Sequence, residues 1–226
     1  MKITYYGHSC FGVKSNQHQL LFDPFIQYNE LAKHIQLQDI HCDFMLISHG
    51  HEDHLADAME IAQANDTLMI SNFEVISWFQ NKGVEKAHPM NHGGKKSFDF
   101  GSAKYVNAIH SSMLPDGANG GNPGGFIVEF GDKTFYYAGD TALFSDMKLF
   151  SAQYQFDFAF LPIGDNFTMG IEDAIIAADF IQCDRIIGMH YDTFPPIKID
   201  HQHAVQAFKD KGKELILIEI GSSLEL

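Results

Sequence analysis

Histidine and aspartate gather in one short stretch of the chain, which reads HGHEDH over residues 49–54. Imidazole and carboxylate groups are ligands that proteins use for zinc, manganese, iron and related metals. The stretch supplies four of them, His49, His51, Asp53 and His54. Four ligands in one loop are too close together to surround a single ion comfortably. The spacing therefore predicts part of a metal site, and we expect further ligands from other segments.

Three more candidate ligands occur where an apolar run ends. His110 ends AKYVNAIH, Asp140 ends FYYAGD and His190 ends RIIGMH. The HGHEDH stretch likewise follows an apolar run, DFMLIS, and α/β proteins place their sites at the carboxyl ends of strands. A lone histidine in such a place is more often a satisfied polar residue. The shared topology favours one common site.

Strands and helical patterns alternate around these residues. We expect an opening β meander over residues 2–24, a strand over 97–101 and a long strand over 214–220. The last third alternates strand and helix, which is typical of a sheet covered by helices. The Gly/Pro/Asn-rich stretch 111–125 is too short for a domain linker, so we interpret it as a loop over a site.

Composition favours one folded domain over residues 1–226. Hydrophobic residues make up 45% of the chain, and its 20 phenylalanines are spread along the sequence. With 29 acidic and 15 basic residues, the formal charge is -14, so a polyanion meets a repulsive average field. We therefore expect a small-molecule substrate and no nucleic-acid partner.

The sequence also bears on location. The start, MKITYYGHSC, lacks the apolar region of a signal peptide, and no apolar run reaches the ~18 residues that a membrane helix needs. Cys10, Cys42 and Cys183 are far apart and form no CxxC pair, so neither a disulfide framework nor a cysteine zinc site is indicated. We expect a cytoplasmic protein without a membrane partner.

Four motifs in sequence carry a family resemblance. HGHEDH, then His110-Ser111-Ser112, Tyr137-Ala138-Gly139-Asp140-Thr141 and Gly188-Met189-His190 follow the order of the ligand motifs of the metallo-β-lactamase superfamily. Gly7-His8-Ser9 and the segments 162–170 and 190–195 resemble a bacterial branch of metal-dependent hydrolases. That branch is similar to L-ascorbate-6-phosphate lactonase and, more distantly, to the phospholipase D that acts on N-acyl-phosphatidylethanolamine. The resemblance spans residues 3–220.

The resemblance implies a fold and a ligand set. The fold is an α/β (α+β) four-layer αββα sandwich. The cofactors implied are two divalent ions, zinc or manganese foremost, with iron or nickel as alternatives. One ion is held by His49, His51 and His110, the other by Asp53, His54 and His190, and Asp140 bridges both. Homo-oligomers among such relatives make a homo-oligomer an expectation here as well.

Two ions about 3.5 to 4 Å apart would turn the water between them into a hydroxide near neutral pH. That hydroxide attacks a carbonyl or phosphorus whose oxygen is polarised by the metals. The chain is thus expected to be a dinuclear metal-dependent hydrolase of a small ester, lactone or phosphoester. Asp53 could also orient the hydroxide or protonate the leaving group.

Other polar residues near the motifs have two interpretations each. His8 is either a substrate or proton-transfer residue or a core histidine bonded to backbone. Polar groups after the strand ending at Gly164 either fix substrate or a metal-bound histidine, or cap the helix that starts near Gly170. The pair after His190 is expected to support that ligand. The polar groups after Gly164 are Asp165, Asn166 and Thr168, and the pair after His190 is Asp192 and Thr193.

Two alternative functions remain open at this stage. A ribonuclease-like phosphodiesterase of the same fold would need a basic surface for RNA, and the chain has no Lys/Arg cluster. A non-catalytic metal-binding scaffold protein is the other alternative. Seven intact ligands count against it, because loss of catalysis should have removed at least one of them.

Overall fold

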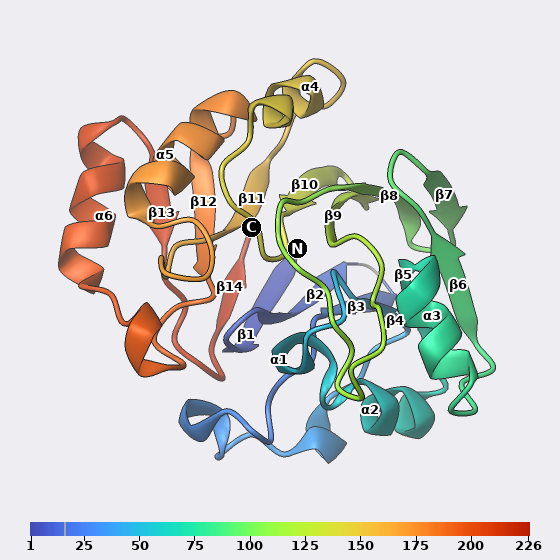
Figure 1. The fold of residues 1–226 in the computed structure, drawn as a ribbon. Coiled ribbons are helices and arrows are strands. Elements are labelled where there is room, and N and C mark those ends of the chain that lie inside the picture. The colour runs from blue at the N-terminus through green and yellow to red at the C-terminus, as the bar shows by residue number, and fades with distance from the viewer. Residues whose placement is uncertain (16) are drawn as a thin grey trace.

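The computed structural model describes residues 1–15 and 17–226, whose strands form two seven-stranded sheets (Figure 1). The first sheet, in spatial order, contains β14 (Ser223–Glu225), β1 (Lys2–Gly7), β2 (Cys10–Ser15), β3 (His18–Phe22), β4 (Phe44–Leu46), β5 (Leu68–Asn72) and β6 (Ala87–Met90). The second contains β13 (Glu214–Ile216), β12 (Arg185–Met189), β11 (Phe158–Pro162), β10 (Lys133–Tyr137), β9 (Gly124–Phe130), β8 (Gly101–Asn107) and β7 (Lys95–Phe98).

Helices cover the outer face of each sheet. Helix α3 packs on β5 and β6, whereas α5 packs on β11 and α6 on β13. In Figure 1, α5 and α6 lie on one side of the strands, and α2 and α3 lie on the opposite side. The helices are α1 (Glu52–Leu55), α2 (Ala58–Asn65), α3 (Phe73–Gln80), α4 (Lys148–Ser151), α5 (Ile171–Phe180) and α6 (His201–Asp210). The expected four-layer αββα sandwich is confirmed.

The alternation of side chains along a strand explains why two sheets pack together. In β3, Leu20 and Phe22 belong to the core between the sheets, whereas Leu21 belongs to the core under α2 and α3. Successive side chains of a strand point to opposite faces, so an all-apolar strand must be covered on both. The rings of Phe22 and Tyr137, one from each sheet, stack with centroids 4.5 Å apart.

Each sheet contains both kinds of strand pairing. Strands β14, β1, β2 and β3 pair antiparallel, and β3, β4, β5 and β6 pair parallel. The second sheet repeats this arrangement, with antiparallel pairs from β7 to β10 and parallel pairs from β10 to β13. The parallel strands send their carboxyl ends to one edge, where polar loops can meet.

Two expectations about strands were wrong, and one strand was missed. The run 214–220 is a strand only over Glu214–Ile216, because β13 pairs with β12 over those three residues alone. The strand expected over 97–101 is interrupted between Phe98 and Gly101, where β7 turns into β8. Strand β14 was not expected, because its polar sequence becomes a strand only by pairing with the exposed edge of β1.

The described residues contain no helix with the length and apolar character needed to cross a membrane. All three cysteines are buried and unpaired.

Candidate metal centre

Loops that follow strands of both sheets bring the candidate ligands together. From the first sheet, His8 follows β1, Asp23 follows β3, and residues 49–54 follow β4 and begin α1. From the second sheet, Asp140 and His190 follow β10 and β12, and His110 lies three residues beyond the end of β8. The site therefore lies where the carboxyl ends of strands from two sheets converge.

Asp140 occupies the middle of the cluster. Its Oδ2 atom lies 3.0 Å from His190 Nε2, 3.2 Å from His54 Nε2 and 3.5 Å from His110 Nε2. Ligand atoms bound tetrahedrally to one zinc ion lie roughly 3.3 Å from each other, given bond lengths near 2 Å. Asp140 Oδ1 and His54 Nε2 are also buried without a hydrogen-bond partner in the described part of the chain. Both observations fit a shared cation.

Candidate ligand atoms form three groups, in each of which they lie within 4.8 Å of one another. The first group is His49, His51 and His110, the second is His8, Asp53, His54 and His190, and the third is Asp23, His49 and His54. In the first group, His49 Nε2 faces His51 Nδ1 at 2.9 Å. The first two groups correspond to the two ligand sets that the resemblance implied, except that the second also contains His8 and that Asp140 is in neither.

Asp23 orients two of the imidazoles, and sequence reasoning missed it. Its Oδ2 lies 2.8 Å from His54 Nδ1 and accepts a hydrogen bond of 2.6 Å from Ser48 Oγ, which in turn lies 2.9 Å from His49 Nδ1. Tyr137 OH also donates to Asp23 Oδ2, at 2.8 Å. Because a carboxylate only accepts, the proton on His54 Nδ1 points to Asp23, and a cation at Nε2 would take the place of the second proton that Asp140 favours there.

A signal for Asp23 was present in the sequence. Like His190, it follows an apolar strand directly, at the end of the run HQLLFD. Its partners Ser48 and His54 lie 25 and 31 residues away in the chain. The end of the strand was a signal for this position, but only the fold shows what the carboxylate contacts.

The protonation of the cluster suits metal binding. Burial, together with neighbouring His54, holds the pKa of His49 well below its ordinary value, so this imidazole stays neutral. Burial opposes the ionisation of Asp140, but His190 and His54 still hold its pKa well below the usual range. The pKa of His54 is raised despite burial, because Asp140 and Asp23 flank it. Two buried carboxylates that favour a proton at this point also favour a metal cation.

His8 is fully buried and connects two other candidate residues. Its Nε2 lies 3.2 Å from Asp53 Oδ2, and its Nδ1 lies 2.9 Å from Thr193 Oγ1. Burial, with a smaller contribution from His190, lowers the pKa of His8 to about 4. A neutral His8 with one proton must place it on Nε2, toward the acceptor Asp53, and its Nδ1 then accepts from Thr193.

The other predicted substrate residues contact their own loops. Asp165 and Asn166 are exposed, and Asp165 Oδ1 accepts from the Asn166 amide. Thr168 Oγ1 donates to the Met169 carbonyl at 3.3 Å. None of the three caps α5, whose N-cap is Gly170 without a side-chain hydrogen bond.

Asp192, in the loop after His190, contacts residues at and just before the start of α6. Its Oδ2 lies 2.6 Å from His201 Nε2, and its Oδ1 accepts from the Ile199 amide at 3.1 Å. The loop after His190 is thereby tied to the start of α6. Asp200 caps that helix as expected, with its side chain accepting from the His203 amide.

The loop expected over the site is firmly attached. Leu114 is buried in the core under α2 and α3, and Asn72 Nδ2 donates to the Gly120 carbonyl at 2.7 Å. Trp78 Nε1 donates to Asp116 at 2.6 Å, and Ser112 Oγ accepts from the Gly50 amide at 3.0 Å. The loop thus ties His110 of the second sheet to the HGHEDH loop of the first.

A cavity of about 420 Å³ opens onto the cluster. Its polar lining consists of ligand candidates and Ser111, and its apolar lining is Phe167, Phe194 and Pro196. Sequence reasoning pointed to polar neighbours of these residues and missed the apolar ones, because an apolar side chain in a loop carries no chemical signal by itself.

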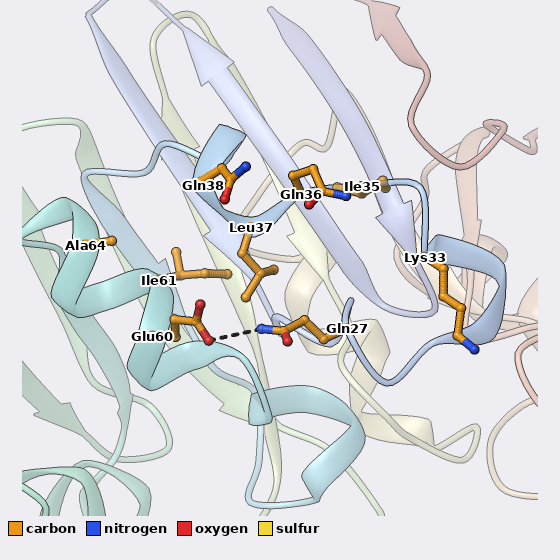
Figure 2. A pocket seen from close by; sticks show the side chains of 9 residues that line it. All are labelled: Gln27, Lys33, Ile35, Gln36, Leu37, Gln38, Glu60, Ile61 and Ala64. Atoms are coloured by element: carbon orange, nitrogen blue, oxygen red, sulfur yellow. Dashed lines mark hydrogen bonds between the residues drawn. The ribbon is translucent and has the colours of Figure 1, made fainter.

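A second cavity, of about 400 Å³, lies between α2 and the segment 27–38 (Figure 2). Glutamine amides line it, and Gln27 Nε2 donates to Glu60 at 3.0 Å, as the dashed line in Figure 2 shows. Neither a histidine nor an aspartate lines it. It therefore lacks the ligands that distinguish the cavity at the cluster.

Comparison with known proteins agrees with the fold and with a metal-dependent hydrolase. Residues 2–190 match the family model of the β-lactamase superfamily domain, so the chain belongs to that superfamily. A UPF0173 metal-dependent hydrolase of Christiangramia forsetii is 53% identical over 227 residues, and one of Bacillus subtilis is 42% identical over 233 residues. Both alignments cover 100% of each chain. Within the superfamily, the chain is a member of this family of metal-dependent hydrolases.

A solved structure supports the same assignment. Igni18, a metallo hydrolase from the archaeon Ignicoccus hospitalis, superposes with a TM-score of 0.89 at 33% sequence identity. The alignment covers 100% of this chain and 98% of that one.

Proposed function

We propose that this chain is a dinuclear hydrolase of a small ester, lactone or phosphoester. The proposed ligands of one ion are His49, His51 and His110, and those of the other are Asp53, His54 and His190. Asp140 belongs to both sets, and its position carries the proposal: one carboxylate oxygen lies 3.0 to 4.0 Å from an imidazole nitrogen of His49, His54, His110 and His190.

Divalent ions held by these residues would supply a nucleophile from water near neutral pH and polarisation of the bond to be cleaved. The protein's own groups then have separate tasks. Asp53 takes up a proton at a carboxylate oxygen and returns it to the leaving group. His8 donates from Nε2 to Asp53 and accepts from Thr193, which holds the Asp53 carboxylate in one orientation. The His8 side chain is completely buried, which fixes the donor side of this hydrogen bond.

The first test is metal content, measured by plasma mass spectrometry on protein purified without chelator. We expect nearly two ions per chain, and zinc or manganese is the leading choice. Asp140→Asn should remove at least half of the metal, because its carboxylate serves both groups. Asp99→Asn, an exposed residue between β7 and β8, is the matched control and should retain all of it.

Activity is measured on the same preparations with bis-p-nitrophenyl phosphate and a simple lactone. Turnover that depends on added metal and is lost in Asp140→Asn supports the proposal. Protein that takes up no metal on reconstitution would contradict the ligand assignment. Metal-loaded protein without turnover of either substrate would contradict the chemistry and favour a metal-binding scaffold.

The cysteines and the net charge also bear on where the protein acts and on what kind of substrate it takes. Three buried, unpaired cysteines fit a reducing cytoplasm. A formal charge of -14 favours a small substrate over nucleic acid. One continuous apolar cluster contains residues from β1 to α6 and joins the space between the sheets to the layer under α5 and α6, which supports one domain over residues 1–226.

A further inference from the structure

The cavity at the candidate metal centre has two walls of different chemistry. One wall carries the ligand candidates, and the other carries Phe167, Phe194 and Pro196. Of the residues that line it, none is lysine or arginine. A volume of about 420 Å³ is in the range of sites for small organic molecules.

Phe194 forms the fixed part of the apolar wall. Its ring centroid lies 5.5 Å from that of His8 and 6.3 Å from that of Phe25, in edge-on and tilted arrangements. Phe25 is buried and His8 is held by two side chains, so Phe194 has a rigid support. An aromatic wall beside reacting groups can bind an apolar substituent by burial and ring contact.

Phe167 forms the open part of the wall. Its side chain is 53% exposed, although a phenylalanine gains free energy when it is buried. The preceding Asp165 and Asn166 both have positive φ, 61° and 57°, and this tight turn presents Phe167 at the cavity. Backbone strain of this kind needs support from the surrounding structure, here the hydrogen bond from the Asp165 amide to the Met169 carbonyl.

Charge excludes a different kind of substrate. A sugar phosphate places a doubly charged group away from the bond that is cleaved, and that group needs lysine, arginine or several N–H donors. The lining residues offer no such cation, and the net charge of the chain is -14. The cavity therefore disfavours a second anionic group.

We propose that the substrate is an uncharged carboxylic ester or lactone whose acyl or alkyl substituent is apolar and rests against Phe167 and Phe194. This inference depends on the proposed function for the cleavage itself. In that step, the oxygen of water bonds to the carbonyl carbon and the bond from that carbon to the ester oxygen breaks. One proton of the water goes to the leaving oxygen, which gives an alcohol and a carboxylic acid.

The first experiment measures kcat/KM of the metal-loaded full chain on p-nitrophenyl acetate, butyrate and hexanoate. Each added CH2 group that enters an apolar cavity should raise kcat/KM by about three- to fourfold. Phe167→Ala should lower kcat/KM for the hexanoate about tenfold and leave the acetate nearly unchanged, whereas Phe167→Leu should restore most of the loss. Leu149→Ala, an equally exposed apolar residue on α4, is the matched control and should change neither.

The second experiment measures binding without turnover. Hexanophenone, an uncharged ketone that cannot be hydrolysed, should bind more tightly than acetophenone in ligand-observed NMR, with and without metal. Phe167→Ala and Phe194→Ala should weaken the hexanophenone signal, and Leu149→Ala should not.

The outcomes separate this inference from the proposed function. Hydrolysis that does not rise with chain length, or a preference for a phosphorylated sugar lactone over p-nitrophenyl hexanoate, would overturn the apolar substrate and leave the hydrolase intact. Absence of hydrolysis of every substrate, with hexanophenone still bound through Phe167, would overturn the hydrolase and leave the apolar site. Equal binding of the two ketones would overturn the apolar site as well.

Discussion

At the scale of single residues, the arrangement of the site depends on Asp23 as well as on the ligands. Its carboxylate accepts from Tyr137 and Ser48 and lies beside His54 Nδ1. Partners of this kind fix which nitrogen of an imidazole faces a metal and raise its basicity. Without Asp23, the imidazole of His54 would lose the hydrogen bond that fixes its orientation.

Asp23→Asn should therefore weaken metal binding without removing any ligand. We expect a 10- to 100-fold loss of affinity, which is typical when a hydrogen-bond partner of a ligand is changed. Competition with a chromophoric chelator measures it. Asp99→Asn serves again as the control, and an unchanged affinity in Asp23→Asn would show that Asp23 has only a structural role.

Cysteine reactivity gives a second prediction at this scale. Burial raises the pKa of Cys42 and of Cys183 to about 11, and that of Cys10 well above its ordinary value. Ellman's reagent at pH 8 should therefore label the native chain very slowly and all three thiols in denaturant. Rapid labelling of native protein would contradict the burial.

The same thiols predict a stability change at alkaline pH. Their pKa values are raised in the folded state, so the folded chain holds protons that the unfolded chain releases above about pH 9. The free energy of unfolding should thus fall as the pH rises from 9 to 11. Replacement of Cys42 by alanine, measured by urea unfolding at pH 8 and pH 10.5, should make that fall smaller.

At the scale of elements, sequence reasoning brought together the residues of the candidate metal centre, whereas it placed the ends of several strands wrongly. HGHEDH, His110, Asp140 and His190 were located because each follows an apolar strand, and strand ends are readable from periodicity. Phe167 and Phe194 were not, because their role depends on a cavity formed by two loops that are far apart in the chain. Strand β14 was missed for a related reason, since only the edge of β1 makes it a strand.

Gly139 shows how closely the strand ends approach. It has a φ of 61°, and a Cβ atom there would lie 2.7 Å from Ser48 Cβ and from the Gly124 carbonyl oxygen. Gly139→Ala should lower the free energy of unfolding by about 3 kcal/mol or more, from backbone strain and overpacking together.

Gly117→Ala is the matched control for urea unfolding. Gly117 also has a positive φ, of 82°, but no atom lies within 4 Å of its added Cβ. Gly117→Ala should therefore lower the free energy of unfolding only by the cost of backbone strain, about 1 to 2 kcal/mol. Equal losses of unfolding free energy in the two variants would mean that the close approach of the two sheets at Gly139 can accommodate a Cβ atom.

At the scale of the whole molecule, a bound metal should stabilise the fold. An ion that binds only the folded chain adds about 2.7 kcal/mol when its free concentration is 100 times its Kd. For a chain of this size that corresponds to a rise in Tm of about 5 to 10 °C. Thermal unfolding with chelator, and again after zinc or manganese is restored, measures the change. An identical Tm in both states would argue against a metal in the folded protein.

The division of the chain between two sheets has a consequence for the order of folding. Apart from β14, each sheet is built from consecutive strands of one half of the chain, so its pairings are local and can form early. The candidate ligands come from both halves, with His49 and His54 from one and Asp140 and His190 from the other. The complete cluster exists only after the two halves have docked, so an ion bound by all of these residues would be acquired late and should act mainly by slowing unfolding.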